Sequence, residues 1–508
     1  MKKHFLFIFL VGMFTVIALC TGCPFGNRIV DYYGDDTFKN GYSDYEYVYG
    51  NILTEDHYIE HAQKARKQQL INIAKTGAWE TSDISIKNAL QTIYAKEMHK
   101  HIGGSNTVTA TLIDEYKKPI VVLDNPNRSS KIEPCKEFTL SLYELKTDRF
   151  SGYAITSPDQ RIGNIIAIIE SPYKKDDDID FAIDFQWRLE RYLQHVADMW
   201  NSITDEDINT VKTASSGESH LLGSPLITKS AYTFSDWQWL DGNSNSILKT
   251  KWDQGEPFNT CITAVEGELD IPAGSTTVQV AQILLFHKYA SFTTSPHSAT
   301  IREKWIDAKD WDGTYDWNML TQTTCPTSTS SQAVKLQVGA FIYDIAKGCR
   351  AKFAVGKTTV YDMSRDYYFR KCGYTVNNSF YSLDNIKKSI NAGCPVPITG
   401  TARSTYNTPV IPKYERLAFI VDGYVTLSCR AEKDGKAPIT IVSELVHCNI
   451  GCGGKKDGWY FSDIFTMGNR PPTRNNNEQD DPDTKPTNNY LRFFLTQLNM
   501  LKPKQAKR

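Results

Sequence analysis

Three stretches between residues 252 and 461 carry residue types that could perform nucleophilic catalysis. WDQGEPFN holds Gln254 in a turn, and a fixed glutamine amide can donate a hydrogen bond to a developing oxyanion. GSTTVQVAQIL places Ser275 at the start of an apolar, helix-like run, where its hydroxyl is a nucleophile, a helix cap or the remnant of a different residue. HCNIGCGGKKDGWYF joins His447 to a glycine-rich loop and a strand.

These stretches, in this order, resemble the streptopain family of papain-like cysteine peptidases, which bacteria make as zymogens. YDWNML, GCPVPITG and RLAFIVDGY match further motifs of the family, and GYAITSPDQRIGNIIAI resembles its inhibitory propeptide. The resemblance implies an α+β fold, in which a papain-like peptidase domain follows an α+β propeptide-like domain. It also implies a catalytic pair formed by a cysteine at a helix N-terminus and a histidine on a strand.

The catalytic positions of the family are changed in this chain. Aligning the motifs puts Ser275 at the nucleophile position and Leu417 at the position of the basic histidine. Gln254 is retained as the oxyanion-hole candidate and Asn449 as the orienting candidate. The two tryptophans that the family places in the glycine-rich loop are replaced by Ile450 and Cys452.

The changes remove the chemistry of the pair. A cysteine at a helix N-terminus ionises readily, whereas a serine hydroxyl attacks only when a general base takes its proton, and Leu417 can accept none. Losing the nucleophile or the base of such a unit costs about a million-fold in turnover. We therefore expect Ser275 to be a helix cap, among the three hydroxyls of GSTT, or a vestige of the nucleophile.

Two histidines are alternatives to the missing base. His287 lies twelve positions along the same expected helix from Ser275, about 18 Å of helix axis, and is expected to be structural. His447 lies near the loop that ends at the site and is the better candidate. An active endopeptidase that uses Ser275 with a base such as His447 remains the alternative function.

Composition and the N-terminus indicate an exported protein. The 508 residues carry a formal net charge of −1, so there is no basic field for nucleic acid. Lys2 and Lys3 precede an apolar run that is typical of a signal peptide. CTGC then predicts cleavage before Cys23 and lipidation of that residue, with a plain secretory signal as the alternative. We expect a lipoprotein at the outer membrane or cell surface of a bacterium.

Composition shifts divide the chain. Residues 1–22 are the predicted signal peptide, 23–55 a tether, 56–201 the propeptide-like domain, 202–223 an exposed linker and 224–508 the peptidase-like domain with a low-complexity loop at 469–489. In the first domain we expect a helix across 58–73 and another across 85–98, capped by Thr81 or Ser82. A hairpin from GYAIT to IIAIIES should follow, and then a helix over FAIDFQWRLERYLQHVADMW, residues 181–200.

Neither a cofactor nor a metal is predicted. Nine cysteines follow the signal region, an odd number that cannot pair completely, and a disulfide or a buried thiol is favoured over zinc at His447, Cys448 and Cys452. GCGGKK lacks the ending of a phosphate-binding loop. The expected function is binding of a peptide or protein in the former cleft, or of a related peptidase through the propeptide-like domain. A purely structural surface lipoprotein is the weaker alternative.

Overall fold

The computed structural model describes the chain from residue 64 onward, in several ranges. These are 64–77, 80–102, 108–122, 124–148, 151–173, 183–209, 233–243, 246–288, 292–404, 413–433, 438–466 and 491–500. The predicted signal peptide, Cys23, the tether, most of the linker and the low-complexity loop lie outside these ranges. No helix within them is long and apolar enough to cross a bilayer.

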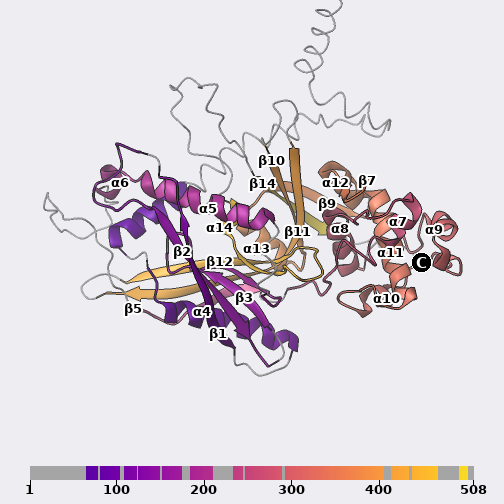
Figure 1. The fold of residues 1–508 in the computed structure, drawn as a ribbon, viewed down its shortest axis with the longest axis horizontal. Coiled ribbons are helices and arrows are strands. Elements are labelled where there is room, and N and C mark those ends of the chain that lie inside the picture. The colour runs from indigo at the N-terminus through magenta and orange to yellow at the C-terminus, as the bar shows by residue number, and fades with distance from the viewer. Residues whose placement is uncertain are drawn as a thin grey trace, which may run out of the picture. The chain divides into compact units, whose positions relative to one another are not determined.

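The first region contains helices beside an antiparallel meander (Figure 1). Its elements are a helix at 64–76, β1 (Thr109–Pro119), β2 (Glu137–Lys146), β3 (Ser151–Thr156), β4 (Ile165–Ile169), and helices α4 (Asp83–Ile102), α5 (Ile183–Asn201) and α6 (Asp205–Asn209). The predicted hairpin and the second predicted helix are confirmed, and so are the described parts of the other two helices, whereas residues 58–63 and 181–182 lie outside the described ranges. The Ser82 hydroxyl accepts a hydrogen bond from the Ser85 N–H at 3.3 Å. Helix α6 occupies the first part of the predicted linker.

The second region supplies most of the sheet and a group of helices (Figure 1). Its strands are β5 (Thr233–Phe234), β6 (Gln238–Asn243), β7 (Lys352–Ala354), β8 (Lys357–Thr359), β9 (Tyr374–Phe380), β10 (Val396–Ser404), β11 (Lys413–Glu432), β12 (Ile439–Asn449), β13 (Gly458–Phe461) and β14 (Leu491–Met500). Its α-helices are α7 (Thr260–Glu266), α8 (Ser275–Phe286), α9 (Ser298–Lys304), α10 (Trp317–Gln322), α11 (Gln332–Gly348), α12 (Asp362–Lys371), α13 (Leu383–Asn391) and α14 (Asp463–Thr466).

One antiparallel sheet runs through both regions in the order β1-β2-β3-β4-β13-β12-β11-β10-β14-β9, and β5 and β6 also pair with β11. The two regions meet where β4 pairs with β13, with Ile169 opposite Gly458. A Cβ at Gly458 would lie 2.1 Å from the Ile168 carbonyl oxygen, so only glycine allows this close approach. The mixture of helices and antiparallel strands confirms the α+β class.

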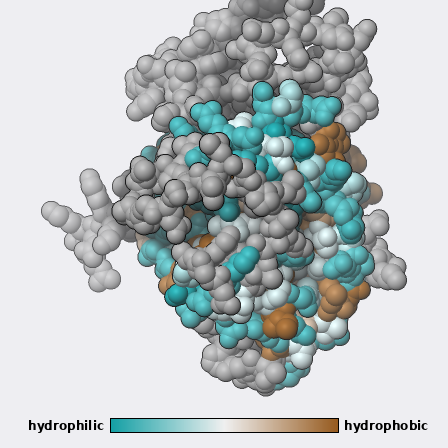
Figure 2. Space-filling model, turned by 90° about the vertical axis from the view of Figure 1, so that its left-hand side faces the viewer, coloured by the Kyte–Doolittle hydropathy of each residue, from teal (hydrophilic) through white to brown (hydrophobic). Residues whose placement is uncertain are grey.

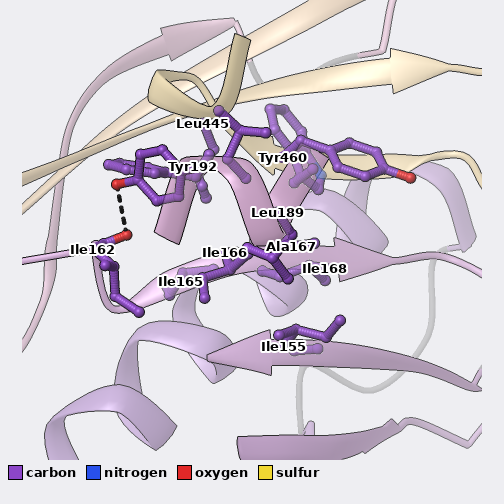
Figure 3. Packing of buried hydrophobic residues seen from close by; sticks show 14 of the residues in the cluster. Ile155, Ile162, Ile165, Ile166, Ala167, Ile168, Leu189, Tyr192, Leu445 and Tyr460 are labelled. Carbon is purple, nitrogen blue, oxygen red and sulfur yellow. Dashed lines mark hydrogen bonds between the residues drawn. The ribbon is translucent and has the colours of Figure 1, made fainter. Parts of the chain in front are cut away.

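The same junction is packed by a shared hydrophobic core. Every residue of β4 is buried, as a short β-branched run covered on both faces requires. Figure 3 shows the residues of β4 from Ile165 to Ile168 beside Leu189 and Tyr192 of α5, with Leu445 and Tyr460 of the second region next to them. The Tyr192 hydroxyl donates to the Ile162 carbonyl at 3.0 Å. The hydrophobic effect therefore holds the two regions together along the β4–β13 seam.

Residues from Lys64 onward form one compact unit, so both predicted domains contribute to it. The division at residues 202–223 stays a prediction, because most of that segment lies outside the described ranges. A second core lies under α8 and α11. On the face shown in Figure 2, the described residues are mostly hydrophilic, with a few separate apolar patches. Single exposed apolar residues of this kind are ordinary for a folded protein.

Candidate functional site

Helix α8 is the central element of the candidate site. Ten of its residues, Thr276 to Leu285, are buried, so the helix is enclosed on all sides although it carries two glutamines. It begins at Ser275, and the residue before it, Gly274, has φ +86°. A Cβ at Gly274 would lie 3.0 Å from the Thr358 Cβ in β8, so glycine is required on two counts.

The predicted cap was wrong. Gly274 is the N-cap residue and makes no side-chain bond, so none of the GSTT hydroxyls caps the helix from that position. Packing of β8 against residue 274 demands a glycine there, which moves Ser275 to the first position inside the helix. The Ser275 side chain is half-buried, and no described residue hydrogen-bonds its hydroxyl. The nearby Thr277 hydroxyl is buried without a partner.

The backbone holds Gln254 next to Ser275. The N–H of Ala273, two residues before Ser275, donates to the Gln254 carbonyl at 2.8 Å. The Gln254 side chain is half-buried, and within the described ranges its amide makes no hydrogen bond. Gln254 therefore lies near the start of α8, and its role in an oxyanion hole stays a prediction.

A buried glutamine joins the three sequence stretches. Gln282 of α8 accepts a hydrogen bond from the Trp252 N–H at 3.3 Å and donates to Asn449 Oδ1 at 3.0 Å. Asn449 Nδ2 in turn donates to the Thr250 carbonyl at 2.7 Å. These bonds satisfy polar groups that would otherwise be buried unpaired. Asn449 thus lies beside α8, and its side chain is occupied in holding the loops together.

Leu417, the predicted base position, lies on β11 opposite Gly400 of β10. Helix α8 is bonded to these strands through Gln279, one turn after Ser275. The Gln279 Nε2 donates to the Ile398 carbonyl at 2.9 Å and to the Phe419 carbonyl at 2.6 Å. The helix face that carries Ser275 and Gln279 therefore points toward the β10–β11 pair, on which Leu417 lies two residues before Phe419.

His447, the alternative base, is engaged elsewhere. It lies on β12 with 3% of its side chain exposed, and Nδ1 contacts Asp422 Oδ1 at 2.5 Å while Nε2 contacts Glu170 Oε1 at 3.1 Å. Lys251 Nζ pairs with Glu170 Oε2 at 3.0 Å, and Asp422 Oδ2 accepts from the Leu248 N–H at 3.1 Å. Both ring nitrogens are therefore occupied by carboxylates.

The charges in this network stabilise one another. Burial alone would lower the pKa of His447, but Asp422 and Glu170 raise it well above its ordinary value of 6.5. Burial would raise the pKa of Glu170, but His447 and Lys251 hold it well below its usual range. The imidazole is accordingly an imidazolium at neutral pH, with no lone pair to accept a proton from a hydroxyl.

Glu170, Asp422 and Lys251 were missed by the sequence analysis. Glu170 follows β4 in the first region, whereas Lys251, Asp422 and His447 belong to the second. The Glu170 N–H also donates to the Asp457 carbonyl at 3.0 Å. A charged residue directly after a fully apolar strand, such as Glu170 after IIAII, is the signal that could have drawn attention to it.

The glycine-rich loop connects this network to the site. Asp457 Oδ1 accepts from the Ile450 N–H at 2.8 Å, and the Gly453 N–H donates to the Trp252 carbonyl at 3.1 Å. Burial raises the pKa of Asp457 to about 7. The Cys452 thiol is half-buried, and burial raises its pKa as well. It therefore lacks the thiolate character of a reactive cysteine.

The remaining candidates have structural surroundings. His287 follows the last residue of α8, where Nδ1 contacts the Tyr374 hydroxyl at 2.9 Å and burial lowers its pKa to about 4. None of the nine described cysteines, which all follow Cys23, forms a disulfide bond. Among the described residues, no group of three histidine, cysteine or acidic side chains could hold a metal ion.

The structure therefore brings together the start of α8, the loop that carries Gln254 and the end of β12 that carries Asn449. Residues 252–460 match the model of the peptidase C10 family. This match confirms, for that part of the chain, the resemblance to the streptopain family that the motifs indicated. In structure the chain is similar to a fragment of prointerpain A from Prevotella intermedia, with 15% sequence identity and a TM-score of 0.41, over 77% of this chain and 100% of that one. No curated protein matches the sequence.

Proposed function

We propose that this C10-family homologue has lost peptidase activity and acts by binding a peptide or protein in the former cleft. The observation that carries the proposal is the pair of residues at the catalytic positions, Ser275 on α8 and Leu417 on β11. A serine hydroxyl without a base does not become a nucleophile, and an oxyanion hole alone supplies only about 10³–10⁴ over water. The backbone bond from the Ala273 N–H to the Gln254 carbonyl, which keeps the Gln254 loop beside α8, supports the binding part of the proposal.

The surroundings of the histidines argue against the alternative of a serine peptidase. His447 would have to release Asp422 or Glu170 and lose a proton before it could act as a base. His287 lies at the far end of α8 and contacts Tyr374. Within the described ranges no other histidine hydrogen-bonds or pairs with any element of the Ser275 site.

We also propose that the protein is exported and lipidated at Cys23, so that the folded part is held at a bacterial outer membrane or cell surface. The support is the sequence alone: two lysines, an apolar run and CTGC. Peptides, other proteins or a related peptidase bound through the first region are the partners that this location offers. Cys23→Ala should move the protein from the membrane fraction to the soluble exported fraction, and an unchanged fractionation would contradict lipidation.

The test of inactivity uses the purified chain with casein and with serine- and thiol-directed activity probes. Wild type should neither cleave casein nor be labelled. Labelling of the wild type that disappears in Ser275→Ala would contradict the proposed loss of peptidase activity. The paired variant Ser275→Cys with Leu417→His restores the residues of the family and should become labelled by the thiol probe, whereas each single variant should not.

The test of binding uses an immobilised peptide library and a variant that fills the cleft at its centre. Ser275→Phe places a ring at the mouth of α8, where the present side chain is half-buried. Peptides selected on wild type should lose binding to this variant and keep binding to Ser275→Ala. Equal binding to both variants would place the peptides elsewhere on the protein.

A further inference from the structure

Strand β1 lies at one end of the sheet, and in the described part of the chain only one of its edges is paired. That edge bonds to β2, and no described strand pairs with the other edge. Ala110 is the only buried residue of the eleven in β1. Open edges attract unwanted pairing, so proteins usually keep them short or cover them. An exposed edge strand of this length therefore calls for a partner or for protection.

The charges on this strand do not have the pattern of simple protection. Its middle reads DEYKK, from Asp114 to Lys118, between a β-bulge at Leu112–Asp114 and Pro119. Charges of one sign would keep two copies of the strand apart, because like charges that face each other across a strand pair are destabilising. Here two acids precede Tyr116 and two lysines follow it. The strand is therefore complementary in charge to a second, antiparallel copy of itself.

One antiparallel register pairs all four charges of each copy. In it, Tyr116 faces Tyr116, and Asp114 of each copy faces Lys118 of the other. Glu115 likewise faces Lys117. A shift by one residue leaves only half as many opposite-charge pairs, and a shift by two places Glu115 opposite Glu115 or Lys117 opposite Lys117. An in-register parallel arrangement places every charge opposite its own kind. The charge pattern thus selects both the direction and the register of pairing.

The contacts within one copy leave the acids of this stretch available. Both lysines are held by carboxylates of the same copy, at 2.6 Å from Glu137 and 2.5 Å from Glu190. No described residue forms a salt bridge with Asp114 or Glu115, whose carboxylates accept only from the Glu115 N–H and the Ser141 hydroxyl. An ammonium group has three donors, so each lysine can bind an acid of the second copy and keep its own. The second copy thus supplies the cations that these two acids lack.

Exposed apolar side chains flank the charged stretch at both ends. Leu112 and Ile113 precede it and are 48% and 41% exposed. Val121 and Val122 follow it and are 69% and 39% exposed. Antiparallel pairing brings the first two residues of one copy to the last two of the other. Each end of the contact then removes apolar surface from water, which favours association.

We propose that two copies of this protein dimerise by antiparallel pairing of their β1 strands, with Tyr116 at the two-fold axis. Main-chain bonds join the two sheets, the charge pairs set the register, and the apolar ends add buried surface. The contact uses the same edge of both copies, so the assembly closes at two. It lies in the first region and does not depend on whether the Ser275 site binds or cleaves peptides.

The first experiment measures the dimer by sedimentation velocity of the purified full-length protein across a micromolar concentration series. One double variant is Asp114→Lys with Glu115→Lys, and the other is Lys117→Glu with Lys118→Glu. Each turns every opposite-charge pair into a repulsive one and should dimerise about a hundredfold more weakly than wild type. An equal mixture of the two double variants again places an acid opposite every lysine and should recover the dimer.

Recovery by mixing separates the contact from a defect in folding. Substitutions that merely unfolded the strand would not be restored by a partner with the opposite charges. A wild type that stays monomeric across the series would overturn the proposal, and so would a mixture that fails to recover the dimer. A wild-type dimer that neither double variant weakens would also overturn it, because another surface would then hold the two copies.

The second experiment tests the register by cross-linking. Residues directly opposite each other on antiparallel strands have Cα atoms about 4.5–5.5 Å apart, which a disulfide can span. Tyr116→Cys should therefore form a disulfide-linked dimer when the protein is oxidised with diamide. Thr109→Cys, on the same strand but far from the axis, should cross-link no more than wild type. Equal cross-linking of the two variants would overturn the proposed register.

Discussion

The positions of Ser275 and His447 are two polar centres of the same region with opposite surroundings. No described residue hydrogen-bonds the Ser275 hydroxyl, and Leu417, which we propose occupies the base position, cannot carry charge. The His447 imidazole is buried between Asp422 and Glu170, with Lys251 behind Glu170. A partly exposed catalytic group can be replaced at little cost to folding, whereas each buried charge leaves its partners unpaired when it is removed. The difference teaches that the fold depends on the polar residues around His447 and does not depend on the Ser275 hydroxyl.

The largest expected effect comes from breaking the charged centre. His447→Leu leaves Asp422 and Glu170 buried without their shared cation, and removing one member of a buried ion pair typically costs about 3–5 kcal/mol. We expect a fall of that size in the free energy of unfolding, measured by urea denaturation. If the loss is below about 1 kcal/mol, the network does not hold the two regions together.

The same substitution at another histidine is the control. His287→Leu removes one hydrogen bond to Tyr374 from a ring whose pKa burial has lowered to about 4, so the ring is neutral. A neutral hydrogen bond contributes about 1 kcal/mol net. His287→Leu should therefore destabilise the protein several-fold less than His447→Leu.

The pH dependence of stability should show the same network. The folded pKa of Glu170 lies below its ordinary value of 4.5, so its contribution is present above pH 4.5 and is lost as the pH falls. The folded pKa of His447 lies above 6.5, so its contribution is present below pH 6.5 and declines as the pH rises further. Stability should be greatest between these values, and urea midpoints across the pH range would measure it.

The control for this prediction removes one titrating group. Glu170→Gln keeps the shape of the side chain but cannot ionise, so the loss of stability below pH 4.5 should become shallower. If the free energy of unfolding falls just as steeply below pH 4.5 in this variant, other carboxylates cause the acid sensitivity.

A smaller effect is expected at the carboxyl group that joins the network to the glycine-rich loop. Asp457→Asn retains an oxygen that can accept from the Ile450 N–H but removes a charge that burial disfavours. Because the folded pKa is raised to about 7 from 3.8, the aspartate is favourable below pH 3.8 and costs stability as the pH rises toward 7. The variant should gain on the order of 2 kcal/mol at pH 8. If the variant is less stable than wild type at pH 8, the ionised Asp457 carboxylate stabilises the folded protein.

The sequence predicted local elements and motif positions, but not the contacts between distant residues. The β3–β4 hairpin and helices α4 and α5 follow from local periodicity, and the motif order correctly indicated the family. The pairing of His447 with Glu170 joins residues 277 positions apart, and nothing local to either predicts it. The capping role of Ser275 failed because Thr358, far along the chain, decides which residue fits at position 274.

The smallest expected effect is at Ser275 itself, and it completes the comparison. Ser275→Ala removes a hydroxyl that caps nothing and has no hydrogen-bond partner among the described residues. Alanine also has the higher helix propensity, by less than about 0.7 kcal/mol. The free energy of unfolding should therefore change by no more than about 0.5 kcal/mol, and casein cleavage should stay at background in both proteins. Thr277→Ala, which removes a fully buried hydroxyl from the same turn, is the matched variant. If Ser275→Ala destabilised the protein as much as His447→Leu does, Ser275 would be structural, and its place at the nucleophile position would no longer indicate a vestige.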